Sequence, residues 1–147
     1  MKNTARLVWW VLFAVVGTGA AGAQASGSDA LAHARAFSFD QMPVTKMANG
    51  GESRNIVHGV LATGETVALH ESMQPAGSVP NPAHKIQHSE FIVVEEGTLL
   101  FLHDGKEEKV GPGGVLYVAF GTLHQVRNIG NGPVKYVVIA IGGDTKK

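Results

Sequence analysis

Residues 113–128 read Gly113-Gly-Val-Leu-Tyr-Val-Ala-Phe-Gly-Thr-Leu-His-Gln-Val-Arg-Asn128. This stretch contains two short extended runs, Val115 to Val118 and His124 to Asn128, each long enough for a strand and too short for a helix. Gly113 and Gly121 stand at their boundaries, where turns are expected. The stretch therefore predicts two consecutive β-strands, with His124 at the start of the second.

The rest of the chain after residue 36 follows the same pattern of short apolar runs separated by Gly, Pro, Asn and Asp. Asp104-Gly105 lies between two such runs and predicts a tight hairpin turn. No segment after residue 35 shows a helical period over ten residues, so the pattern favours an all-β sandwich or barrel. The remaining predicted strands are Asn55 to Ala62, Glu65 to Met73, Ser89 to Val94, Thr98 to His103, Glu107 to Val110 and Lys135 to Ile141.

The first residues have the order of a secretory signal peptide. Lys2 and Arg6 precede an apolar run from Leu7 to Val16, and small residues with an Ala-x-Ala pattern follow. The alternative is an uncleaved anchor, but the apolar run is short of the ~20 residues that span a bilayer. We expect a signal peptide at 1–23, a mobile leader at 24–36 and one domain at 37–147. The mature protein would be periplasmic or secreted and free of the membrane.

Composition excludes several classes of site. The chain of 147 residues has no cysteine, so disulfides and thiolate metal ligands are absent. Loss of Lys2 and Arg6 would take twelve basic residues to ten against twelve acidic ones. This balance does not suggest a nucleic-acid partner, which calls for clustered basic charge.

Four ionisable residues are candidates for a metal site: His84, His88, Glu90 and His124. Imidazole nitrogen and carboxylate oxygen are common ligands of first-row divalent ions. His88 and Glu90 are two residues apart on a predicted strand, so they project from one face. His84 can join them only if the chain bends, and His124 must come from a separate strand.

The segment around Glu90 resembles the first motif of the cupin superfamily, a set of small jelly-roll barrels. In that motif a glycine and a His-x-His pair precede a glutamate, and a second glycine follows it. Here His84 stands six residues before Glu90, and Gly97 ends the motif. Two departures are that Gly77 lies one residue further from His84 than usual and that Ile86 replaces the second histidine.

Residues 113–128 are similar to the second cupin motif. Gly113, Gly121, His124 and Asn128 have the spacing of that motif, and only its proline is replaced, by Ala119. The 15 residues 98–112 that separate the motifs are a typical gap for the family. The resemblance implies a single-domain cupin jelly-roll β-barrel.

The resemblance also implies a ligand set. It carries His84, Glu90 and His124 over as ligands of a divalent metal ion, and Fe, Mn, Zn, Ni and Cu are not distinguished. His88 is added by the alternation of strand residues, as a replacement for the ligand lost at Ile86. The alternative is a metal-free polar pocket, since an isoleucine in the mouth of the barrel would lower metal affinity.

Two hypotheses of function stay open, and a third ranks below them. A metal held by three histidines and a glutamate would keep about two open positions for a small-molecule substrate or dioxygen, as in an oxygenase-type enzyme. A non-catalytic barrel would capture a small ligand instead. A purely structural role would leave the motif residues unused. We also expect a homodimer formed by strand pairing.

Three further histidines receive plainer interpretations. His58 and His70 fall in predicted strands, and either of them could line the barrel. A histidine on a strand is more often a solvated or hydrogen-bonded residue at the edge of the core. His103 adjoins the Asp104-Gly105 turn, which predicts a position on the surface.

Overall fold

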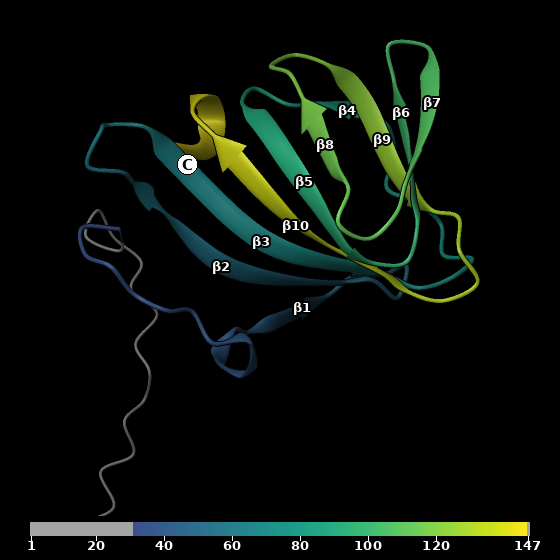
Figure 1. The fold of residues 1–147 in the computed structure, drawn as a ribbon, viewed down its shortest axis with the longest axis horizontal. Helices are drawn as coiled ribbons and strands as arrows, with labels where there is room; N and C mark the ends of the chain where they lie inside the picture. Colours follow the sequence, from purple (N-terminus) through teal and green to yellow (C-terminus); the bar gives the residue numbers. More distant parts are fainter. Residues whose placement is uncertain (1–30, 147) are drawn as a thin grey trace, which may run out of the picture.

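A computed structural model describes residues 31–146 and shows two facing antiparallel β-sheets (Figure 1). The six-stranded sheet runs in the order β1 (Val44–Lys46), β2 (Glu52–Val60), β3 (Thr66–Gln74), β10 (Val134–Ile141), β5 (Ser89–Glu96) and β8 (Val115–Val118). The four-stranded sheet runs β4 (His84–Lys85), β9 (Leu123–Asn128), β6 (Leu99–His103) and β7 (Lys106–Val110). The chain thus crosses between the sheets several times, as in a jelly roll.

The all-β prediction is confirmed, and each predicted strand has a counterpart within a few residues of its expected bounds. The sequence pattern missed the short strands β1 and β4 and two 3-10 helices, η1 (Phe39–Gln41) and η2 (Gly143–Lys146). Among the described strands no hydrogen-bonded ladder joins the two sheets, so they form an open sandwich where a closed barrel was expected.

The predicted signal peptide at 1–23 and residues 24–30 of the predicted leader lie outside the described residues. Within residues 31–146 no helix is long and apolar enough to cross a membrane.

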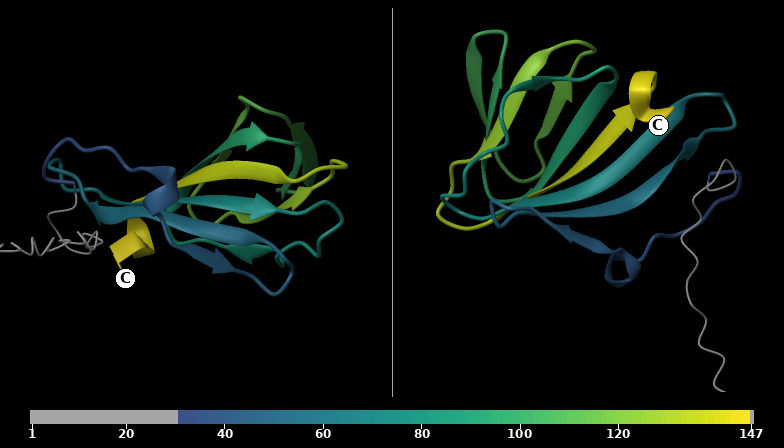
Figure 2. Two further views of the ribbon diagram at one scale, coloured as in Figure 1. Left: turned by 90° about the horizontal axis from the view of Figure 1, so that it is seen from below. Right: turned by 180° about the vertical axis from the view of Figure 1, so that it is seen from behind.

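The two sheets lie close together at one end of the sandwich and splay apart at the other (Figure 2). Asn128 of β9 ties the close end, because its backbone N–H donates to Gln74 Oε1 at 3.0 Å and its Nδ2 donates to the Gln74 carbonyl at 2.9 Å. Gln74 Nε2 in turn donates to the hydroxyl of Tyr136 at 2.9 Å. Buried side-chain amides therefore hold the sheets together where no ladder does.

The core fills the space between the sheets. Along β10 the even-numbered side chains point inward, and all four are buried: Val134, Tyr136, Val138 and Ala140. They pack with buried side chains from the strands around them, namely Ile86, Ile92, Val94, Leu99, Phe101, Leu116 and Val118. Burial of these apolar side chains is the main favourable contribution to folding.

Gly97, which ends the first motif, occupies a position where no side chain fits. Its φ is +77°, and a Cβ there would lie 2.5 Å from the carbonyl oxygen of Pro133. The turn after β5 therefore needs glycine both for its left-handed backbone and for the close approach of the chain before β10.

We predict that Gly97→Ala lowers the free energy of unfolding by about 3 kcal/mol, because it combines backbone strain with a backbone clash. Chemical denaturation of the purified variant measures this loss. Gly132→Ala is the matched control, since an added Cβ at Gly132 meets no heavy atom within 4 Å. Equal losses in the two variants would contradict the steric argument.

Candidate functional site

Three of the four predicted site residues come from three strands near the splayed end of the sandwich, and the fourth, His88, lies in the bend just before β5. Glu90 lies near the start of β5, and its register partners are Ala140 of β10 and Val118 of β8, which both face the interior. His124 lies near the start of β9 and pairs directly with His84 of β4. The chain bends between His84 and Glu90, since the two residues belong to different sheets. The bend that the prediction required is thus present.

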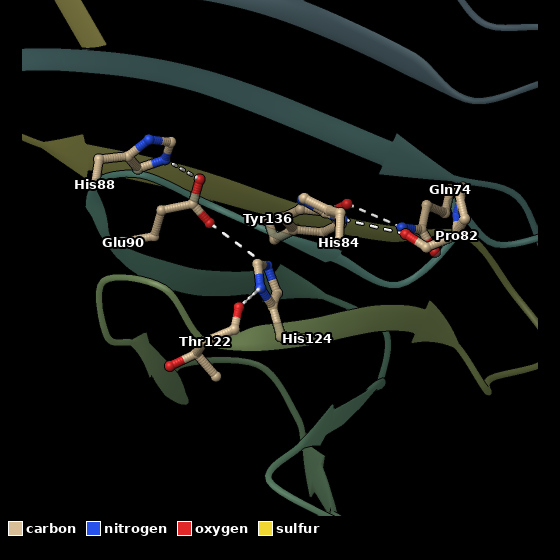
Figure 3. Close-up of polar contacts among 8 residues, drawn as sticks. All are labelled: Gln74, Pro82, His84, His88, Glu90, Thr122, His124 and Tyr136. Carbon is tan, nitrogen blue, oxygen red and sulfur yellow. Dashed lines mark hydrogen bonds and ion pairs between the residues drawn. The ribbon is translucent and has the colours of Figure 1, made fainter. Parts of the chain in front are cut away.

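Glu90 is the centre of the polar contacts (Figure 3). His88 Nε2 lies 2.8 Å from Glu90 Oε1, and His124 Nε2 lies 3.9 Å from Glu90 Oε2. The side chains of His88, Glu90 and His124 are 15%, 12% and 3% exposed. A carboxylate is therefore flanked by two imidazoles in a largely dry environment, where electrostatic interactions are stronger than in water.

His84 and His124 lie side by side, and the Nδ1 atom of each ring faces a backbone carbonyl. Their ring centroids are 4.6 Å apart with planes tilted by 50°. His84 Nδ1 lies 3.1 Å from the Pro82 carbonyl, and His124 Nδ1 lies 3.2 Å from the Thr122 carbonyl. Since a carbonyl only accepts, each Nδ1 carries the proton and each Nε2 is left with a lone pair. Metal-binding histidines commonly have this second hydrogen bond.

Burial favours the neutral form of the inner imidazoles. Desolvation lowers the pKa of His124, and the neighbouring charges of His84 and His88 act in the same direction, against the Thr122 carbonyl and Glu90. Desolvation also lowers the pKa of His70 on β3, while the charge of Glu90 opposes that shift. A neutral imidazole can act as a ligand or as a proton acceptor.

His70 and His103 also lie in this neighbourhood. An interior position was an open alternative for His70, whereas His103 was expected at the surface. His70 faces the interior opposite Val138, next to the row of Glu90 on the same sheet. His103 pairs with His124 in register and stacks on Phe101 at 4.2 Å, so its side chain is only 18% exposed. The surface position predicted for His103 is wrong, because its ring stacks on the buried Phe101 two residues earlier on the same face of β6. The alternation of side chains along a strand shows that His70 and His103 face the interior only when the register of the strands is known.

Ile86 does not line the mouth of the site as expected. It is 6% exposed and belongs to the apolar core cluster. Its backbone carbonyl accepts a hydrogen bond from Gly121 N–H at 3.0 Å, which joins the two motif segments. The residue at the family's second-histidine position therefore contributes packing.

The donors present are those that a divalent ion takes, and the anchored Nδ1 atoms turn the two Nε2 lone pairs of His84 and His124 away from the backbone. Within residues 31–146, however, no three His, Asp or Glu side chains are gathered closely enough to hold a metal ion as they are placed. The residues fit such an ion in donor type and ring orientation, and their side chains would have to close around it.

We predict that His84 and His124 are Nδ1–H tautomers at neutral pH, because both Nδ1 atoms face carbonyl oxygens. Long-range ¹H–¹⁵N correlation spectra distinguish the tautomers of each ring. His58 is the internal control, since its Nε2 faces the Thr145 carbonyl and should carry the proton there. An Nε2–H tautomer at His84 or His124 would show that the Nε2 atom of that ring is not available to a metal ion.

Comparison with known proteins assigns the chain to a family. A family model described as a cupin domain matches residues 69–140, which hold Glu90 and His124. An uncharacterised protein of Methanocaldococcus jannaschii is 31% identical over 98 residues, which cover 66% of this chain and 78% of that protein.

Solved structures agree with the match. An RmlC-like cupin from Shewanella frigidimarina is similar with a TM-score of 0.63 and 15% identity, over 76% of this chain and 94% of that one. A protein described as a predicted oxalate decarboxylase, from Thermotoga maritima, has a TM-score of 0.60 and 18% identity, over 73% of this chain and 98% of that one. At these identities the likeness concerns the fold. The two motifs, the jelly-roll crossing of the strands and the family match together show that this chain belongs to the cupin superfamily.

Proposed function

We propose that this protein is an exported cupin that holds one divalent metal ion among His84, His88, Glu90 and His124 and presents it to a small molecule. The observation that carries the proposal is the approach of His88 and His124 to separate oxygens of one buried carboxylate. Structural burial of a carboxylate is costly unless a partner compensates its charge. Neutral His88 can donate one hydrogen bond to it, and His124 with an unprotonated Nε2 donates none, whereas a divalent cation would compensate the charge fully.

The spacing of the donors supports the ligand set. Two ligands at right angles on one ion, each about 2.1 Å from it, lie about 3 Å apart. The His88 Nε2 to Glu90 Oε1 separation of 2.8 Å has that value. The 3.9 Å between His124 Nε2 and Glu90 Oε2 would shorten by rotation of the carboxylate. His84 would approach by rotation of an exposed side chain.

A divalent ion in this place would supply Lewis-acid polarisation of a bound oxygen atom. The chain's own residues have other tasks. The carbonyls of Pro82 and Thr122 hold two rings in the tautomer that leaves Nε2 unprotonated. His88 Nε2–H donates to Glu90, so this proton must move to Nδ1 or leave before Nε2 can act as a ligand. Because a histidine ligand needs an unprotonated nitrogen, metal binding should weaken in acid. The apolar core beneath the site keeps water away from one side of it.

The second candidate function is capture of a small ligand without a metal. Two observations favour it: Ile86 belongs to the core and cannot act as a ligand, and no three donors among residues 31–146 are assembled as they stand. Oxygen uptake with candidate substrates separates an oxygenase-type enzyme from a binding protein, since a protein that only captures its ligand consumes none.

We predict near-stoichiometric divalent metal in the purified mature protein and a loss of at least about ten-fold in metal affinity in each of His84→Ala, Glu90→Gln and His124→Ala. Each change removes a donor that no neighbour replaces. Elemental analysis and calorimetric titration with Zn²⁺ and Ni²⁺ measure content and affinity. Saturating metal should also raise the thermal midpoint, because it binds only the folded form.

His33→Ala is the matched control, because this exposed histidine lies outside both sheets and should leave the metal content unchanged. A parent protein without metal that also fails to bind either ion above the pKa of histidine would favour the metal-free ligand pocket.

A homodimer through β8 is the expected assembly. This strand forms the outer edge of the six-stranded sheet, and its Val115 and Tyr117 side chains are 56% and 55% exposed. Phe91 extends the apolar patch, with its ring 5.1 Å from that of Tyr117. An open edge beside exposed apolar side chains is a surface on which a second strand can pair.

We predict that the parent sediments as a dimer and that Tyr117→Lys sediments as a monomer, because it introduces a charge next to its copy at the two-fold contact. Leu123→Lys is the control, since Leu123 is 52% exposed in the other sheet. A parent that sediments as a monomer would exclude the edge-to-edge dimer.

A further inference from the structure

A second polar pocket lies on the opposite face of the six-stranded sheet. Along β10, Ala140 pairs with Glu90 and Val137 pairs with Glu71. Because these β10 residues are three apart, their side chains point to opposite faces, and so do Glu90 and Glu71. Glu71 therefore points away from the histidine cluster. The pocket has a volume of about 200 Å³ and is lined by Phe39, Glu52, Arg54, Glu71, Met73 and Lys135.

Glu71 is the unusual residue of this pocket. It is only 8% exposed, and within residues 31–146 no group donates a hydrogen bond to its carboxylate or lies within ion-pair distance of it. Burial raises its pKa, helped by the charges of Glu95 and Glu52 and opposed by those of Arg54 and Lys135. The Glu71 carboxylate lines the pocket and has no protein donor, so its hydrogen bonds must come from whatever fills the pocket.

Arg54 is the direct cross-strand partner of Glu71, yet the two do not pair. Their Cα atoms are opposite in the ladder between β2 and β3, where side chains of opposite charge usually meet. The Arg54 guanidinium instead lies over the Phe39 ring at 4.3 Å and donates from one N–H to the Met42 carbonyl at 3.4 Å. Its Nη2 also forms a long ion pair with Glu52 Oε2 at 3.9 Å, which exceeds hydrogen-bond distance. Its other N–H groups make no hydrogen bond within residues 31–146.

The charges around the pocket restrict what it can hold. Two acidic and two basic side chains line it, so a simple cation would meet Arg54 and Lys135, and a simple anion would meet Glu52 and Glu71. A molecule with both an ammonium and a carboxylate group would give Glu71 a hydrogen-bond donor and would give the remaining Arg54 N–H groups an acceptor. The volume corresponds to about seven water molecules, which suits a molecule of amino-acid size.

We propose that this pocket binds a small zwitterion, with its ammonium group on Glu71 and its carboxylate on Arg54. The aromatic ring of Phe39 and the thioether of Met73 would contact the carbon atoms between the two charges. The site is independent of the metal proposal, because it lies on the other face of the sheet and shares no residue with it.

The test is titration of the mature protein with glycine and L-alanine, beside ethylammonium and acetate, which each carry one of the two charges. Two-dimensional NMR follows the Arg54 side-chain N–H and the backbone amides of β2 and β3. Each charge-assisted hydrogen bond that a single-charge probe cannot make should weaken its binding by about ten-fold. Glu71→Gln and Arg54→Met should each weaken L-alanine binding by about ten-fold, while the exposed Glu107→Gln should not change it.

The pH dependence of thermal melting shows whether the Glu71→Gln variant is folded. A carboxyl whose pKa is raised by folding lowers stability as pH rises through its range, so the cost is present at neutral pH and absent in acid. The variant should therefore melt above the parent at pH 7 and no higher in acid. A folded variant that still binds L-alanine as the parent does overturns the proposal. It is equally overturned by ethylammonium or acetate binding as tightly as L-alanine, or by no probe binding at tens of millimolar.

Discussion

The register of β10 between β3 and β5 is the constraint on which both polar regions depend. Ala140 lies opposite Glu90, and Val137 lies opposite Glu71, so one strand presents one carboxylate to each face of the sheet. A slip of β10 by one residue would place its inward-facing residues opposite the outward-facing residues of β3 and β5. The alternating buried residues of β10, from Val134 to Ala140, oppose such a slip, because it would expose all of them.

The same register sets the boundary between the packed core and the polar site. At the row of Ile92 and Val138 branched apolar side chains fill the sandwich beside the His70 ring of β3, whereas the next row toward the splayed end places Glu90 beside Ala140. The small alanine leaves the carboxylate room to turn. His124 is almost fully buried on the facing sheet, and desolvation lowers its pKa, so the neutral ring faces the carboxylate. The polar site thus begins where the side chains of β5 and β10 change from large apolar residues to Glu90 and Ala140.

Sequence alone predicted what depends on local order. Turn residues and short apolar runs located the strands, and the motif spacing brought Glu90 and His124 to one interior. It could not predict what depends on pairing across strands. His70 comes beside the row of Glu90 through two ladders, and His103 comes beside His124 through one, and neither register can be read from the residues themselves. The same limit applies to Ile86, whose inward packing follows from a two-residue strand that no sequence period marks.

The position of Ile86 in the core divides the candidate ligands into two classes. Glu90 and His124 are held by long strands and surrounded by packed side chains, so their positions are largely set before anything binds. His84 lies on a strand of two residues and is exposed, and His88 precedes its strand, so both can adjust at lower cost. Because Ile86 packs in the core, the ligand missing at this position is best replaced by a residue that can move. His88 is such a residue, and it already contacts the Glu90 carboxylate. Two donors fixed by packing and two donors that can move could therefore contact the same ion.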